Sequence, residues 1–264
     1  MMQDNAKRPR RAAAIGLLAA ALAAAAVPAW SAGAGPQARP GWPLPVDDTT
    51  AYAKVLFDRL EYGFGEDEDT LTWDAQFWYG GDYARLWIET EGEVVASGGD
   101  GGEIENLDVL YSRRVSPYWD LQAGLGYQRV YGDGPEPERF YGVLGAQGLA
   151  PYWFEIDANL RVSEVGDAWV DLEAEYDWLL TQRLILQPRF ETSFAFQRAE
   201  EFGVGKGLGS VQLGLRLRYE IRREFAPYIG VSWLRRLGDT ADLAEEEGAD
   251  TDATAVVAGV RMWF

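Results

Sequence analysis

Long stretches in which apolar and polar residues alternate strictly dominate this chain after residue 50, and they constrain its fold more than any other feature. In residues 153–162, apolar side chains hold one set of alternate positions, and charged or amide side chains hold the other. The same alternation covers residues 168–180, 184–196 and 211–221. Because successive side chains of a strand point to opposite faces, each stretch predicts a strand with one apolar and one polar face. A helix would mix the two sets.

The predicted strands are long, at about 10 to 14 residues, whereas strands of soluble proteins average about half that length. A soluble β-sandwich also hides one apolar face, so alternation alone leaves it open. Aromatic residues near the predicted strand ends, such as Tyr118-Trp119, Tyr152-Trp153 and Trp178, favour a membrane barrel because they mark the two lipid–water interfaces. We therefore expect an all-β, transmembrane, antiparallel up-and-down β-barrel of about 12 strands. The predicted strands cover residues 52–64, 71–79, 83–92, 104–115, 118–131, 140–149, 152–163, 168–180, 183–197, 208–222, 225–236 and 254–264.

The connections between these strands alternate in length. Every second link is very short, as at residues 80–82, 116–117 and 181–182. Most of the others are longer and acidic or glycine-rich, as at 93–103 and 237–253. Short turns on one side and long loops on the other are typical of outer-membrane barrels, and they predict that both barrel termini lie in the periplasm.

The first 34 residues predict a secretory signal peptide. A basic segment that ends at Arg11 precedes an apolar run of about 16 residues, 12–27, and Ala32-Gly33-Ala34 offers a cleavage site. The alternative is a membrane-spanning anchor, but the run is shorter than the roughly 20 residues that a spanning helix needs. Residues 35–50 then form a Pro-rich periplasmic linker, and residues 51–264 form the barrel.

Charge and residue content exclude several functions. Without the four basic residues and one acidic residue of the predicted signal, 20 basic and 41 acidic residues remain, a net charge near −21. This balance argues against nucleic-acid binding, which depends on Lys and Arg. The sequence has no His, which hydrolytic triads use as their base, and no Cys, so we expect no enzymatic activity. Glycine-rich residues 98–102 and 203–209 lack the strand–loop–helix context of a phosphate site.

The polar face of the strands should line the barrel lumen. Carboxylates at spacing two on one predicted strand lie about 7 Å apart and could bind or guide divalent cations weakly. The alternative, which we favour, is that Arg residues on neighbouring strands pair with these carboxylates and fill the lumen. Acidic loops at 66–69 and 245–252 are better explained as solvated loops than as cation sites. The candidate metal ligands are Asp157, Asp171, Glu173 and Glu175, and the candidate lumenal arginines are Arg161, Arg189, Arg216 and Arg218.

Several stretches resemble the copper resistance protein B (CopB/PcoB) family of outer-membrane proteins, in order over roughly residues 52–264. The longest are Gly214-Leu215-Arg216-Leu217-Arg218-Tyr219-Glu220 and Arg223-Glu224-Phe225-Ala226-Pro227-Tyr228-Ile229-Gly230-Val231. Shorter ones include Leu56-Phe57-Asp58-Arg59-Leu60-Glu61, Trp119-Asp120-Leu121-Gln122-Ala123-Gly124 and Gly148-Leu149-Ala150-Pro151-Tyr152-Trp153-Phe154.

The resemblance implies an outer-membrane barrel that takes part in copper resistance and homeostasis by copper binding, sequestration or export. It also implies copper as the metal and a periplasmic multicopper oxidase as a partner. Members of the family often carry a segment rich in Met and His before the barrel, but residues 35–50 have neither. The alternative is a small diffusion channel or a structural barrel with no metal role.

Overall fold

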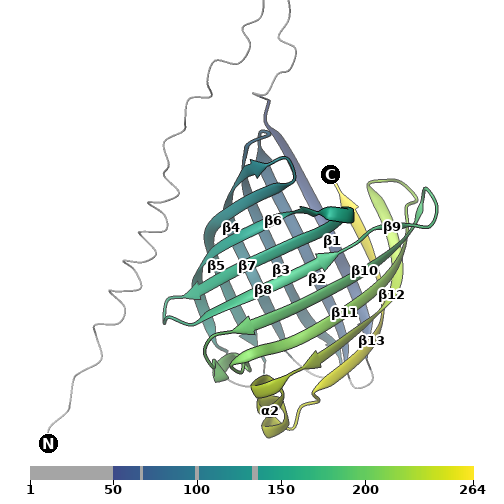
Figure 1. Cartoon of the computed structure of the whole chain (residues 1–264). Helices are drawn as coiled ribbons and strands as arrows, with labels where there is room; N and C mark the ends of the chain where they lie inside the picture. The colour runs from purple at the N-terminus through teal and green to yellow at the C-terminus, as the bar shows by residue number, and fades with distance from the viewer. Residues whose placement is uncertain (1–49, 66–67, 99–100, 133–135) are drawn as a thin grey trace, which may run out of the picture.

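The computed structural model describes residues 50–65, 68–98, 101–132 and 136–264. The predicted signal peptide at 1–34 and residues 35–49 of the predicted linker lie outside the described residues. The rest forms one antiparallel sheet (Figure 1). The strands are β1 (Tyr52–Phe64), β2 (Asp69–Gly80), β3 (Ala84–Ser97), β4 (Gly102–Ser116), β5 (Trp119–Tyr131), β6 (Glu138–Ala150), β7 (Phe154–Ser163), β8 (Ala168–Glu175), β9 (Trp178–Leu179), β10 (Leu184–Ala195), β11 (Gly207–Tyr219), β12 (Phe225–Arg236) and β13 (Asp252–Trp263). The strands pair with their sequence neighbours, except that β8 and β9 both pair with β10.

The sheet closes on itself because β13 pairs with β1. Strands β8 and β9 both pair with β10, so they share one position in the wall and the barrel has 12 strands around its circumference. The break between them falls at Tyr176 and Asp177, opposite Pro188. Tyr176 donates its N–H to the Pro188 carbonyl at 3.2 Å, but proline has no N–H to donate in return. The predicted fold and strand count are confirmed.

The connections differ from the expected ones in four places. The predicted loop at 93–103 is shorter because β3 continues to Ser97 and β4 begins at Gly102. The predicted start of a strand at Tyr152 is instead a 3-10 turn, η1 (Pro151–Trp153). The predicted loop at 237–253 contains a helix, α2 (Gly238–Glu247), and the β10–β11 loop contains a 3-10 turn, η2 (Glu200–Phe202).

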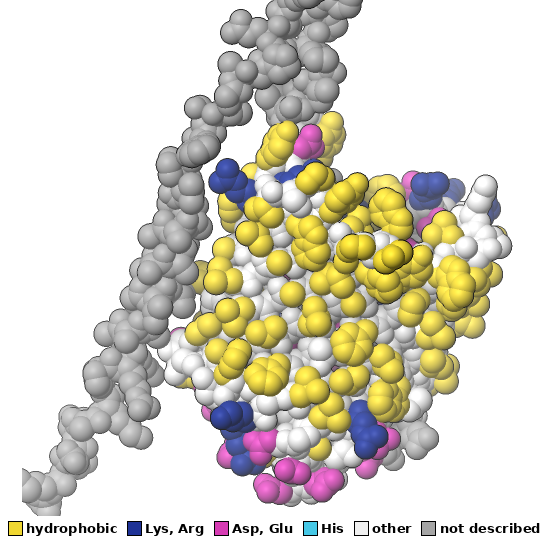
Figure 2. All heavy atoms as spheres, in the orientation of Figure 1, with side chains coloured by type: hydrophobic (Ala, Val, Ile, Leu, Met, Phe, Trp, Pro, Cys, Tyr) yellow, Lys and Arg dark blue, Asp and Glu magenta, His cyan; other side chains and the backbone are white. Residues whose placement is uncertain are grey.

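The outer face of the barrel is covered by exposed apolar side chains. Ile229, Val231 and Leu215 alternate along neighbouring strands and are 64%, 48% and 42% exposed. Figure 2 shows hydrophobic side chains over the middle of the visible face, with Lys, Arg, Asp and Glu gathered toward its two ends. An apolar belt of this extent exceeds what a protein exposes to water, so its surroundings are membrane lipid. In the described residues no helix is long and apolar enough to cross a membrane.

The two ends of the barrel differ. The start of β1 and the C-terminus lie at the end away from α2 (Figure 1). Connections at that end are turns, whereas the two longest connections, at 196–206 and 237–251, lie at the end with α2. We call these the turn end and the loop end.

Candidate functional site

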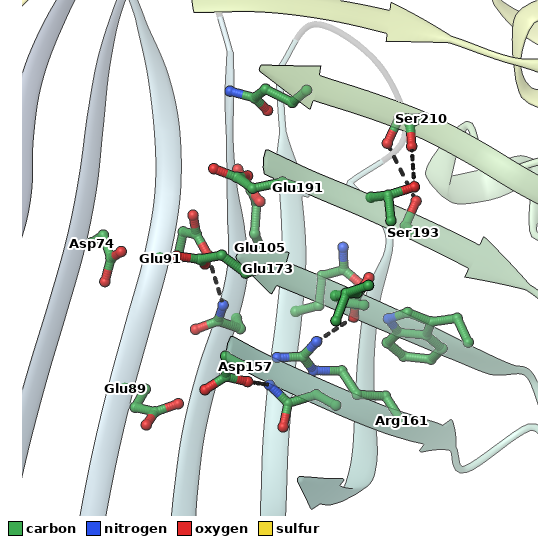
Figure 3. A pocket seen from close by; sticks show the side chains of 18 of the residues that line it. Asp74, Glu89, Glu91, Glu105, Asp157, Arg161, Glu173, Glu191, Ser193 and Ser210 are labelled. Carbon is green, nitrogen blue, oxygen red and sulfur yellow. Dashed lines mark hydrogen bonds and ion pairs between the residues drawn. The ribbon is translucent and has the colours of Figure 1, made fainter. Parts of the chain in front are cut away.

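The inner wall of the barrel encloses a cavity of about 830 Å³. Its lining reaches from Pro117 and Tyr118, in the turn between β4 and β5, to Thr240 and Ala244 on α2. The cavity therefore extends from the turn end to the loop end. Its polar side chains are those that the strand alternation directs inward, as Figure 3 shows for acidic residues of β2, β3, β7, β8 and β10.

The carboxylates predicted on β8 all face this lumen, and all three meet arginines. Asp171 forms an ion pair with Arg161. Glu173 and Glu175 lie 2.7 Å and 3.0 Å from the guanidinium nitrogens of Arg189. The structure thus brings the predicted acids and arginines together as charge pairs.

A central charge cluster joins opposite sides of the lumen. Arg59 on β1 and Arg189 on β10 are both 3% exposed, and each contacts acids from several strands. Among the described residues, these two guanidiniums face five carboxylates, which leaves an excess of negative charge. The cluster consists of Arg59, Arg189, Asp74, Glu91, Glu173, Glu175 and Glu191.

Two further predicted lumenal arginines, Arg216 and Arg218, each form an ion pair with a single acid. Arg216 forms a bidentate ion pair with Glu61, at 2.7 Å and 3.0 Å. Arg218 donates to Asp177 at 2.6 Å. The bidentate, buried pair fixes the side-chain geometry of Arg216, and in both pairs one acid balances the charge of the arginine.

Asp157 is the one predicted metal ligand without an arginine partner in the described residues. Its Oδ1 accepts a hydrogen bond of 2.5 Å from Nδ2 of Asn159, and it lines the cavity. It is therefore the predicted acid most available to a cation.

Sequence reasoning missed several acids that line the cavity, and Glu89 and Glu105 show two reasons for this. Glu89 lies on the same face of β3 as Trp87 and Glu91, so the alternation along this strand could have placed it in the lumen. The apolar Trp87 on that face obscured the polar pattern. For Glu105 the simple alternation fails, because a register shift between Ile104 and Leu107 lets adjacent residues line the same cavity.

Apolar side chains also fill part of the interior. Trp87, Leu110, Tyr141 and Val143 form a buried cluster inside the wall. Tyr141 donates its hydroxyl proton to Asp108 at 2.8 Å, and Arg161 contacts the same carboxylate at 3.1 Å. This cluster narrows the lumen on the β3–β6 side.

The loop end is partly covered by two docked segments. Gly205 donates its N–H to the hydroxyl of Thr240 on α2 at 2.9 Å. The guanidinium of Arg139 lies 3.8 Å from the ring centroid of Trp169 and 4.1 Å from that of Phe202 in η2. The β10–β11 loop is thereby held against the barrel rim.

The donor set bears on which metal ion the lumen could hold. Within the described ranges, no group of three or more His, Cys, Asp or Glu has an arrangement that fits a metal ion. The sequence contains no His and no Cys, and its only Met after residue 2 is Met262. Apart from the Met262 thioether, the side chains of this barrel therefore offer a metal ion oxygen ligands, which suit divalent ions rather than Cu(I).

Comparison with known proteins identifies relatives along most of the chain. The family described as "Copper resistance protein B precursor (CopB)" matches residues 51–264. "Copper resistance protein B" of Escherichia coli is 43% identical over 219 residues, which are 83% of this chain and 72% of that protein. "Copper resistance protein B homolog" of Pseudomonas syringae pv. tomato (strain ATCC BAA-871 / DC3000) is 37% identical over 221 residues, with the same two shares.

Among solved structures, the NanC porin superposes with a TM-score of 0.51 at 12% identity, covering 80% of this chain and 99% of that chain. At this identity the likeness concerns the fold alone, and that fold is an outer-membrane-type barrel.

Proposed function

Since the chain belongs to the copper resistance protein B family, we propose that its barrel binds copper(II) weakly in the lumen and passes the ion along it. Family membership supports a copper-resistance role. The family and the porin-like barrel favour a non-catalytic protein. Beyond this role, we propose the place where the copper ion binds and the atoms that contact it.

The observation that carries this proposal is the surplus of carboxylates along one cavity that reaches both ends of the barrel. The central charge cluster holds more acids than arginines, and Glu89, Glu105 and Asp157 add acids without ion pairs among the described residues. A narrow lumen with low-dielectric walls focuses such a field and raises the local concentration of cations. Anions are repelled for the same reason.

Ligand chemistry sets the form of copper and the strength of its binding. Soft Cu(I) prefers thiolate and thioether, which the described lumen does not supply, whereas carboxylate accepts Cu(II). Of the predicted ligands, Asp157 is the first choice, because Asp171, Glu173 and Glu175 are held by arginines. Binding of this kind favours transit, including export, over tight sequestration.

The proposal is tested with the full chain refolded into liposomes that contain a copper-quenched dye. We expect added Cu(II) to quench the dye faster than in protein-free liposomes, and Asp157→Asn to slow the quenching. Glu136→Gln removes the same charge at an exposed position and should leave the rate unchanged. Quenching no faster than in protein-free liposomes would refute copper passage, and retention of copper against a weak chelator would then distinguish storage from no metal role.

A diffusion channel is the second candidate, and the reach of the cavity to both ends of the barrel favours it. Its signature would be conductance of monovalent cations in planar bilayers with no preference for copper. A membrane that stays electrically silent in potassium chloride would exclude this function.

We also infer that the turn end faces the periplasm, where the predicted signal peptide would deliver the chain and a multicopper oxidase could meet it. Because the sequence has no Cys, single cysteines report orientation cleanly. On intact cells an impermeant maleimide should label Asp250→Cys at the loop end and spare Asp82→Cys at the turn end. The reverse labelling pattern would show that the loop end, and not the turn end, faces the periplasm.

A further inference from the structure

Three oxygen-bearing side chains on the β3 and β7 walls line the cavity and have no cationic hydrogen-bond or ion-pair partner in the described residues. They are Glu89 on β3, and Asp157 and Asn159 on β7. Figure 3 shows Glu89 and Asp157 extending toward one another across the lumen.

The hydrogen bonds of these side chains leave oxygen atoms unused. Oε1 of Glu89 is buried without a hydrogen-bond partner. Asn159 is only 8% exposed, and while its Nδ2 donates to Asp157, its Oδ1 accepts nothing. Buried polar atoms are nearly always satisfied, so unpartnered oxygens on both Glu89 and Asn159, with Asp157 hydrogen-bonded to the Asn159 amide, indicate a missing cation or water.

A glycine makes room for this arrangement. Gly145 on β6 pairs with Asn159, and a Cβ at this position would collide with Oδ1 of Asn159. The same Cβ would lie 3.3 Å from Oε1 of Gln122, an amide that has no partner either. The absence of a side chain at Gly145 thus lets the Asn159 amide lie against the wall with its oxygen free.

We propose that Glu89, Asp157 and Asn159 form an oxygen-ligand site for a hard divalent cation, and that the Asn159 amide turns over when the ion binds, so that its oxygen replaces its nitrogen beside Asp157. Two carboxylates balance the charge of such an ion, and carboxylate and amide oxygens are the ligands that Ca²⁺ and Mn²⁺ prefer. The inference rests on the proposed function in one respect, that cations bind in the lumen. It goes further by naming a site that is not selective for copper and that does not include the arginine-bound acids of β8.

Terbium is the probe for this site, because Tb³⁺ takes oxygen ligands and emits when a nearby tryptophan is excited. Trp87 points to the same side of β3 as Glu89, roughly 7 Å along the strand, and lines the same cavity. With the full chain folded in detergent micelles, we expect saturable Tb³⁺ emission on tryptophan excitation. Ca²⁺ and Mn²⁺ should displace the ion.

The decisive variants separate ligation from general attraction. Asn159→Ala changes no charge and should raise the Tb³⁺ midpoint by about tenfold, which corresponds to roughly 1.4 kcal/mol. Glu89→Gln should do at least as much, whereas Glu105→Gln, the same change on β4, should stay within about twofold. Gly145→Ala, which displaces the amide without removing it, is a second neutral test if Asn159→Ala does not fold.

Two results would overturn the site: no saturable emission, or an equal effect of Glu89→Gln and Glu105→Gln. An unchanged midpoint in both neutral variants would also overturn it, because the Asn159 amide would then bond to Gln122 instead. Copper passage measured on the same variants, refolded into liposomes, keeps the two proposals apart. Copper movement without a Tb³⁺ site would reject only the site, and a Tb³⁺ site without copper movement would reject only the proposed function.

Discussion

Replacing Arg189 by methionine should destabilise the barrel more than any other single lumenal charge change, because Arg189 holds acids from both sides of the lumen. At about 3 Å and an effective dielectric constant near 20, each such contact is worth roughly 5 kcal/mol before the cost of desolvation. Removal of one partner from a buried ion pair typically costs about 3–5 kcal/mol, because the remaining charges stay buried. The guanidinium nitrogens of Arg189 contact Asp74, Glu91, Glu173, Glu175 and Glu191.

The assay is urea unfolding of the full chain in detergent micelles, followed by tryptophan fluorescence. We expect Arg189→Met to lower the free energy of unfolding by about 3–5 kcal/mol. Adding Glu191→Gln should restore part of the loss, since it removes one unpaired charge. Arg129→Met is the control: Arg129 pairs with Glu136 at 2.6 Å, but both side chains are more than a third exposed, so little should change. A loss for Arg189→Met no larger than that of the control would refute the reasoning.

Three further predictions concern the rim, a glycine and a turn. Phe202→Ala should raise single-channel conductance in planar bilayers, because it removes one face of the stack around Arg139 that holds the β10–β11 loop; unchanged conductance would mean that this loop does not limit the passage. Gly126→Ala should lower the urea stability by about 1–3 kcal/mol, because its Cβ would collide with the Tyr141 ring; a neutral result would show that the cluster can shift. Tyr152→Gly should raise the same stability by about 1 kcal/mol, since φ is 68° there; a loss would show that the exposed ring contributes more than the backbone strain costs.

The barrel itself was predictable because its main signal is local. Alternation along a strand depends only on side-chain direction, and β1 and β12 have the predicted bounds of 52–64 and 225–236. Where the pattern failed, a backbone feature interrupted the period. The strand predicted at 168–180 is split opposite Pro188, which has no N–H to donate to the neighbouring strand.

The site was predictable only in part, because charge pairing depends on which strands face each other across the lumen. Alternation placed Asp157 and Asp171 inside, but it could not show that Asp171 meets Arg161 while Asp157 meets none. The free oxygen of Asn159 depends on Gly145 of the neighbouring strand, a contact that no single stretch of sequence encodes. The metal assignment of the predicted acids stays a proposal.

The seam between β1 and β13 has a consequence for how the barrel is made. Val55 and Phe264 exchange two backbone hydrogen bonds, of 3.1 Å and 2.9 Å, although almost the whole barrel sequence separates them. Contacts of such high sequence separation form late, because the entropic cost of closing a long loop must be overcome first. Until β13 arrives, β1 and β12 each present an unpaired edge that could join another chain. The yield of folded barrel should therefore depend on how fast β13 pairs with β1 and on how well the two edges are protected before that. It should depend less on the stability of the finished barrel.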